Sequence, residues 1–170
     1  TATRKSEALS KVPISVAAFN SETLQRSGIK KVDDLVRFTS GLTLGRSPTG
    51  ANTIAIRGIS SDAGAGVTGV YIDDTPIQVR NEGYGSGSAF PEIFDLERVE
   101  VLRGSGSTLY GSDAVGGVIN VITDPLESSS FSLRTALGNF GVNQERGALS
   151  LVRGSVAEQL TFSRDFSSGF

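Results

Sequence analysis

Residues 96–123 read LERVEVLRGSGSTLYGSDAVGGVINVIT, and this stretch decides the fold. It begins with a segment in which acidic, basic and apolar residues mix, passes through a turn region rich in glycine, and ends in an apolar run. The β-branched residues of both runs favour strands, and the glycines between them favour tight turns. The stretch therefore predicts two strands joined by a glycine-rich connection.

This stretch resembles the closing segment of the plug of TonB-dependent outer-membrane receptors, which are barrels whose lumen is filled by a folded N-terminal domain. Four further segments follow the order and spacing of that family: VPISVAAF at 12–19, VDDLVRFTSGLTL at 32–44, IAIRGI at 54–59 and VYIDDTPI at 70–77. Two residues depart from its pattern, since Ser105 stands where proline is usual and Asp74 where glycine is common. We expect these departures to affect local turn geometry only.

The resemblance implies an α+β plug domain, with a mixed sheet of short strands and small helices, followed by the first antiparallel strands of a transmembrane β-barrel. Residues 1–11 then correspond to a periplasmic linker that follows the TonB box, which the sequence does not contain. Residues 12–126 correspond to the plug. Residues 127–170 correspond to about three strands of an incomplete barrel.

Composition agrees with a β-rich domain and excludes several classes of function. The chain has 170 residues, with 21 glycines, five prolines and no tryptophan, which indicates many tight turns. Its 16 basic and 18 acidic residues are spread along the sequence, so we expect no nucleic-acid partner. Cysteine and histidine are absent, which removes thiolate catalysis and histidine-based triads. We predict neither an enzyme nor a bound cofactor or metal.

Local patterns place the plug elements. A β-branched run at 14–19 predicts a strand, and Asn20 or Ser21 is a suitable N-cap for a helix over 22–27 that Gly28 ends. Apolar residues at near-helical spacing predict a second short helix from Val32 to before Gly41. Further strands are predicted around 54–56 and 70–72, with loops at 45–53 and 59–68.

After Pro125 apolar and polar residues alternate, as in the wall of a membrane barrel. The alternation covers 131–137, the region of 149–152, and 160–166. We predict a tight turn at Gly154-Ser155 and a longer loop over 138–146. Plugged transporters use about 22 strands, so three strands indicate an N-terminal fragment.

Two motifs favour structural readings. Residues 64–69 match GxGxxG, but a strand follows where a dinucleotide site needs a helix, so the glycines indicate a loop apex. The pairs Asp33-Asp34 and Asp73-Asp74 do not suit acid/base or metal chemistry, because adjacent side chains on a strand diverge. Asp73 and Asp74 suit a turn in which a carboxylate accepts backbone N–H groups.

The family places three plug loops at the extracellular apex, and these correspond to 45–53, 59–68 and 78–92. From these loops we select Arg46 as a partner for an anionic ferric chelate, Asp62 as an acceptor for hydroxyls, and Tyr84 as a stacking or hydrogen-bonding group. Loop 78–92 also holds Phe90. Its chemistry alone fits equally a binding loop and a surface loop whose aromatic residues pack back onto the domain.

In the family, arginines at the positions of Arg57 and Arg103 pair with barrel-wall glutamates and lock plug to wall. Arginine suits such enclosed bidentate pairs, and both residues precede a glycine at a predicted strand end. Glu97 and Glu100 are candidates to complete this ionic lock. Cross-strand surface pairing that involves Arg98 is the equally favoured alternative.

The resemblance implies a transport receptor in the outer membrane of a Gram-negative cell, which gates the uptake of a scarce nutrient, most often a ferric siderophore or other iron chelate. The partners implied are TonB, the remainder of the barrel, the nutrient and outer-membrane lipid. The alternative is a soluble β-rich carbohydrate-binding module that uses Tyr84 and Phe90 as a platform, against which the strands after 130 argue. The resemblance also implies that barrel loops complete the ligand site.

Overall fold

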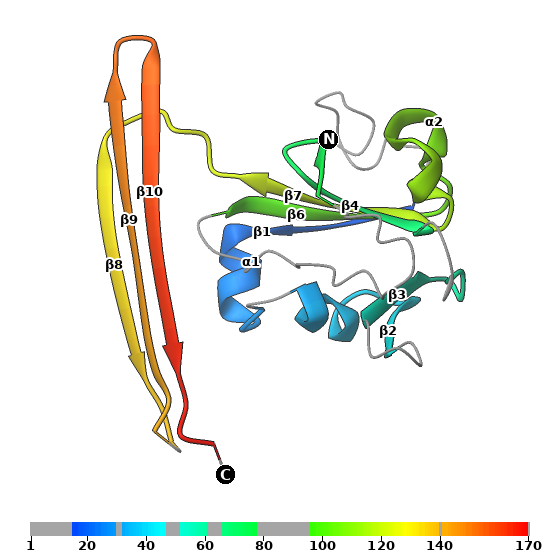
Figure 1. Cartoon of the computed structure of the whole chain (residues 1–170), viewed down its shortest axis with the longest axis horizontal. Coiled ribbons are helices and arrows are strands. Elements are labelled where there is room, and N and C mark those ends of the chain that lie inside the picture. The colour runs from blue at the N-terminus through cyan, green and yellow to red at the C-terminus, as the bar shows by residue number, and fades with distance from the viewer. Residues whose placement is uncertain are drawn as a thin grey trace. The chain divides into compact units, whose positions relative to one another are not determined.

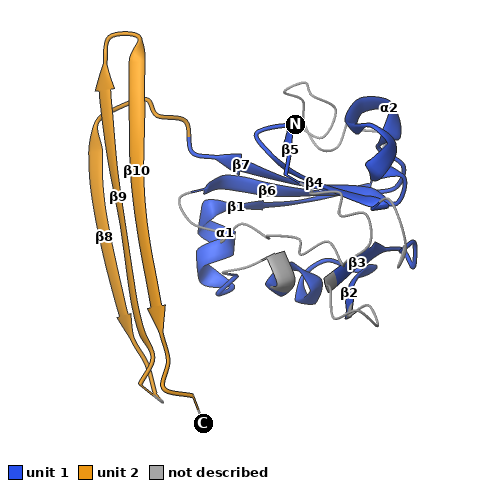
Figure 2. Ribbon diagram, in the orientation of Figure 1, with its two compact units in different colours: residues 1–124 blue, residues 125–170 orange. Residues whose placement is uncertain are grey.

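The structure is a computed structural model that describes residues 15–29, 32–46, 52–60, 66–77, 96–139 and 141–169, with only the backbone at 32, 33, 46 and 52. The chain separates into two compact units, Thr1–Asp124 and Pro125–Phe170, called unit 1 and unit 2 below (Figure 2). This division falls close to the boundary predicted at 126. Among the described residues, no helix is both long and apolar enough to cross a bilayer.

Unit 1 is built on a mixed sheet, which has five strands in the described part of the chain (Figure 1). Their spatial order is β1-β6-β7-β4-β5, and β4 and β7 run parallel while the other neighbours are antiparallel. The strands are β1 (Ser15–Asn20), β4 (Thr68–Ile72), β5 (Thr75–Pro76), β6 (Leu96–Arg103) and β7 (Gly117–Thr123). The two strands predicted from the stretch 96–123 are thus β6 and β7, at the centre of the sheet.

Small elements cover both faces of this sheet. One face carries α1 (Ser21–Arg26), the 3-10 helix η2 (Val32–Arg37) and the hairpin β2 (Leu42–Arg46) and β3 (Asn52–Ile56), while α2 (Ser107–Tyr110) and the 3-10 turn η3 (Ser112–Ala114) lie on the other (Figure 1). The first face forms the larger core, in which Leu24, Leu35 and Ile56 meet Val99 and Ile119. The second core joins Tyr71, Leu102, Tyr110, Ala114 and Val118.

The first helix forms where the sequence predicts it. The Asn20 side chain accepts a hydrogen bond from the Thr23 N–H at 2.9 Å, and Gly28 follows the helix with a φ of 64°. Leu24 is the buried residue of α1. The second predicted helix is confirmed in place as η2, which has the tighter 3-10 geometry.

Unit 2 is an antiparallel sheet with the order β10-β9-β8 in its described residues. Its strands are β8 (Ser130–Leu137), β9 (Asn143–Arg153) and β10 (Val156–Phe166), and Gly154-Ser155 forms the tight turn predicted between the last two. The predicted loop over 138–146 is too long, because Asn143 already pairs with Leu137 and Arg146 with Arg134. This polar run shows no alternation of its own, and its strand geometry comes from pairing with both neighbours.

The two faces of unit 2 differ in chemistry. One face presents large exposed apolar side chains, which are Phe131, Leu133, Leu149, Leu151, Leu160 and Phe162. The opposite face carries small and polar residues, which include Ser132, Arg134, Arg146, Ser150, Thr161 and Asp165. This is the alternation typical of a strand with apolar surroundings on one side and polar surroundings on the other.

Candidate functional site

The two arginines predicted to form the ionic lock both contact one turn of unit 1, which Ser40 and Gly41 form. Arg103 is the last residue of β6, and its Nη1 donates to the Ser40 carbonyl at 3.2 Å and to the Ser40 Oγ at 2.8 Å. Arg57 follows β3 and donates its backbone N–H to the Gly41 carbonyl at 2.6 Å. Although Arg57 and Arg103 are far apart in sequence, the fold brings both to this turn.

The backbone of the turn is specialised at two residues. Arg57 has a φ of 55°, in the left-handed region that few non-glycine residues adopt, and Gly41 has a φ of 81°. The Arg57 Cγ lies 3.6 Å from the position that a Cβ on Gly41 would occupy, so the arginine side chain starts beside the turn. Arg57 is exposed, whereas Arg103 is half-buried.

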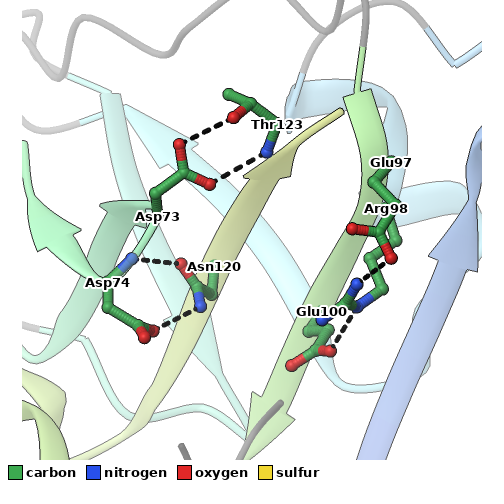
Figure 3. Close-up of polar contacts among 7 residues, drawn as sticks. All are labelled: Asp73, Asp74, Glu97, Arg98, Glu100, Asn120 and Thr123. Carbon is green, nitrogen blue, oxygen red and sulfur yellow. Dashed lines mark hydrogen bonds and ion pairs between the residues drawn. The ribbon is translucent and has the colours of Figure 1, made fainter. Parts of the chain in front are cut away.

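Glu97 and Glu100 lie on β6 and contact Arg98 (Figure 3). The Arg98 Nε lies 2.8 Å from the Glu100 Oε1, and its Nη1 pairs with Glu97. Glu100 is deeply buried, with 6% of its side chain exposed, whereas 43% of the Glu97 side chain is exposed. The contact with Arg98 runs along one strand and does not cross between strands. The lock role of the two glutamates stays a prediction.

A β-bulge explains how neighbouring residues of one strand reach each other. The pairing of β6 with β7 shifts register between Leu96 and Arg98, so Glu97 is the extra residue of the bulged strand. In a regular strand Glu97 and Arg98 would point to opposite faces. The bulge also returns Leu96 to the core that contains Val99.

The electrostatics of this cluster favour the charged arginine. Partial burial lowers the pKa of the Arg98 guanidinium, but the hydrogen bond and charge of Glu100, then the charge and hydrogen bond of Glu97, outweigh that effect. The pKa of Arg98 is therefore raised above its ordinary value. Arg98 carries a permanent positive charge between the two carboxylates.

The Asp73-Asp74 turn joins β4 to β5 and is tied to β7 (Figure 3). The Asp73 carboxylate accepts the Thr123 N–H at 3.0 Å and the Thr123 hydroxyl at 2.8 Å, which confirms the predicted turn role. The Asn120 side chain donates to the Asp74 carboxylate at 2.8 Å and accepts its backbone N–H at 3.4 Å. Sequence reasoning missed Asn120, whose signal in the sequence is a polar residue inside an otherwise apolar strand. In the structure its side chain is buried.

Both turn residues adopt positive φ, at 47° for Asp73 and 62° for Asp74, as in a two-residue type I′ hairpin. Aspartate tolerates this conformation better than most side chains, though less well than glycine. The expected effect of Asp74 on local geometry is therefore small. The turn keeps the backbone shape that glycine favours, and Asn120 holds the Asp74 side chain by a hydrogen bond.

The predicted ligand-binding residues lie at the limits of the described chain. Arg46 ends β2 and pairs through its backbone with Asn52, while Asp62, Tyr84 and the loop 78–92 with Phe90 lie outside the described residues. The loop predicted over 45–53 is shorter, because β2 and β3 extend into it from both sides. The ligand roles of Arg46, Asp62 and Tyr84 stay predictions.

Comparison with known proteins identifies the family of the chain. A family model described as TonB-dependent Receptor Plug Domain matches residues 8–118. The chain is 32% identical over 173 aligned residues to the iron-regulated outer membrane virulence protein of Vibrio cholerae, an alignment with 95% of this chain and 26% of that protein. It is 30% identical to the ferripyoverdine receptor of Pseudomonas aeruginosa, over 72% of this chain and 14% of that protein. It is 31% identical to the vitamin B12 transporter BtuB of Vibrio vulnificus, over 90% of this chain and 24% of that protein.

Solved structures agree with this assignment. The ferric yersiniabactin uptake receptor FyuA of Yersinia pestis superimposes with a TM-score of 0.76 at 24% identity, over 96% of this chain and 26% of that chain. The ferripyoverdine receptor of Pseudomonas aeruginosa, solved with ferripyoverdine bound, gives a TM-score of 0.72 at 26% identity, over 91% and 20%. The chain thus spans about a quarter or less of the length of these relatives.

These findings confirm the predicted resemblance, the fold class and the outer-membrane localisation. They point to a family of transport receptors and not to a family of enzymes. Three findings agree with one another: the plug sheet followed by antiparallel strands, the family match over residues 8–118, and relatives at 30% identity or more. The chain belongs to the TonB-dependent receptor plug domain family.

Proposed function

We propose that this chain is the plug and the first wall strands of an outer-membrane receptor that captures an iron chelate and admits it to the periplasm. The observation that carries the proposal is the joining, in one chain, of a plug sheet to strands with one apolar and one polar face. Relatives named as an iron-regulated outer-membrane protein and a ferripyoverdine receptor support an iron chelate as cargo. The receptor acts as a gated transporter, not an enzyme.

Arg57 and Arg103 serve this function as the plug side of the ionic lock. A guanidinium presents N–H groups in a planar fork that matches a carboxylate, and enclosure strengthens such a pair. Barrel-wall carboxylates are the partners, and Glu97 and Glu100 are the further members proposed for the lock, although in unit 1 both contact Arg98. The residues for the ligand are Arg46, Asp62 and Tyr84. TonB binds a box upstream of Thr1 by adding a strand, which needs only main-chain partners.

A cobalamin is the second candidate cargo, because the vitamin B12 transporter of Vibrio vulnificus is 31% identical over 90% of this chain. The soluble carbohydrate-binding module is set aside, because the chain belongs to a receptor family.

Uptake by whole cells tests the proposal. The full-length receptor is produced in a Gram-negative strain that lacks its own iron-chelate receptors, with and without TonB. The cells are given ⁵⁵Fe bound to hydroxamate, catecholate or mixed chelates, or ⁵⁷Co-labelled cobalamin. We expect one ⁵⁵Fe chelate to bind in both strains and to accumulate only where TonB is present. Accumulation of cobalamin alone would select the second cargo, and accumulation without TonB would refute the gated mechanism.

A further inference from the structure

Ser40 holds one nitrogen of the Arg103 guanidinium through two oxygen atoms. Nη1 is bound twice, by the Ser40 carbonyl at 3.2 Å and by the Ser40 hydroxyl at 2.8 Å. Nε is buried and has no hydrogen-bond partner within the described residues. Because Nε is buried, a carboxylate outside unit 1 would reach the guanidinium at its terminal Nη atoms.

A flexible arginine side chain loses rotamer freedom when it forms a defined ion pair. Ser40 already fixes the guanidinium in unit 1, since two oxygen atoms of one residue hold the same nitrogen. Part of the ordering has therefore taken place before any partner arrives, and preorganisation of this kind increases the strength of an ion pair.

We propose that Ser40 is a positioning residue of the ionic lock, which holds the Arg103 guanidinium in place for a barrel-wall carboxylate. The inference rests on the proposed function, because it concerns the lock between plug and wall. The serine hydroxyl is the specific element, since any residue at position 40 supplies a carbonyl but few supply an oxygen at the position of Oγ.

The same turn also supports the second arginine. The Gly41 carbonyl accepts the Arg57 N–H at 2.6 Å, and this bond accompanies the positive φ of Arg57. Displacement of the Ser40-Gly41 turn would thus disturb both arginines together. Ser40 and Gly41 form a single support for a lock with two cations.

The test uses the full-length receptor and two readouts. The first is the sensitivity of producing cells to vancomycin, which an intact outer membrane excludes and which reports how well the plug seals the barrel. The second is hydrogen exchange of residues 39–46 in the purified receptor, which reports the local stability of the turn. The variants are Ser40→Ala, Ser40→Thr, Arg103→Ala and the double variant Ser40→Ala/Arg103→Ala, at matched amounts of receptor in the membrane.

Loss of one hydrogen bond to a charged group changes an equilibrium by roughly tenfold to a hundredfold. We therefore expect Ser40→Ala to increase vancomycin sensitivity by roughly that factor, while Ser40→Thr, which keeps the hydroxyl, matches the wild type. Arg103→Ala should be at least as sensitive as Ser40→Ala. The double variant should be no more sensitive than Arg103→Ala, because Ser40 acts through Arg103.

Three results would overturn the inference. In the first, Ser40→Ala accelerates exchange of the turn without any leak, so the serine stabilises the turn alone. In the second, its effect on the leak is equally large in the Arg103→Ala background. In the third, Arg103→Ala causes no leak, and the lock fails together with the role of Ser40. Accumulation of a ⁵⁵Fe chelate in the same cells shows separately whether the receptor still transports.

Discussion

Gly117, the first residue of β7, lies where three strands meet, and replacement by alanine should destabilise the centre of the plug. A Cβ at this position would lie 2.5 Å from the Ile56 Cδ1 and closer still to the Leu102 carbonyl oxygen. Unstrained carbon atoms approach to about 3.5–4.0 Å, so these neighbours must move by about 1 Å. Ile56 is fully buried, and the Leu102 carbonyl belongs to the backbone of the paired strand β6.

Overpacking of a well-packed core costs about 1–3 kcal/mol. We expect Gly117→Ala to fall at the upper end, about 3 kcal/mol, because one of the two clashes is with backbone that cannot rotate away. Each 1.4 kcal/mol is a tenfold change in an equilibrium constant, so the opening of this region should become about a hundredfold more frequent.

Native-state hydrogen exchange of the full-length receptor measures this effect at peptides that cover 96–103 and 117–123. We expect their exchange to accelerate about a hundredfold in Gly117→Ala when opening is the limiting equilibrium. Two glycines serve as controls. Gly45→Ala places a Cβ 2.9 Å from the Thr53 hydroxyl, which can rotate, and Gly58→Ala meets open space but has a φ of 77°.

We expect under 0.5 kcal/mol for Gly45→Ala, and about 1 kcal/mol for Gly58→Ala from backbone strain alone. The order Gly117, Gly58, Gly45 is thus the signature of the packing described. Exchange at β6 and β7 that is as slow in Gly117→Ala as in Gly45→Ala would refute the close approach of these strands.

The buried carboxylate of Glu100 should matter more than its exposed neighbour: Glu100→Gln is expected to destabilise the sheet by about 2 kcal/mol and Glu97→Gln by under 1 kcal/mol, as read from exchange of β6 amides. Equal effects of the two changes would contradict the burial described. On unit 2, Leu133→Arg places a charge on the apolar face and should reduce the amount of folded receptor in the outer membrane. A lipid-facing arginine near the bilayer centre destabilises a barrel by about 2–4 kcal/mol. Ser132→Arg on the polar face should leave that amount near the wild-type level, and the opposite order would show that the faces are assigned wrongly.

Features set by neighbouring residues were predictable from sequence. The Asn20 cap and Gly28 define α1 because both act within one or two turns of the chain. The two-residue turn at Gly154-Ser155 follows from the alternation on either side of it. The aspartates of the β4–β5 turn likewise revealed their role by composition and position.

Features set by contacts between distant segments were not predictable. The bulge at Glu97 depends on the register between β6 and β7, and nothing local to the residue indicates it. Asn120 pairs with Asp74 across 46 positions, so a buried amide in an apolar strand had no visible partner. Arg57 and Arg103 were selected as lock candidates by family position, whereas their shared contact with the Ser40-Gly41 turn required the folded chain.

The intact mass of the natural polypeptide shows whether this chain is the plug and first wall strands of a membrane receptor. An antibody against residues 78–92 would detect the polypeptide in the outer-membrane fraction, with samples run in detergent before and after heating. We expect a band several times larger than the 17.7 kDa of this chain, with a mobility that changes on heating as the barrel unfolds. A soluble species of 17.7 kDa would contradict this expectation.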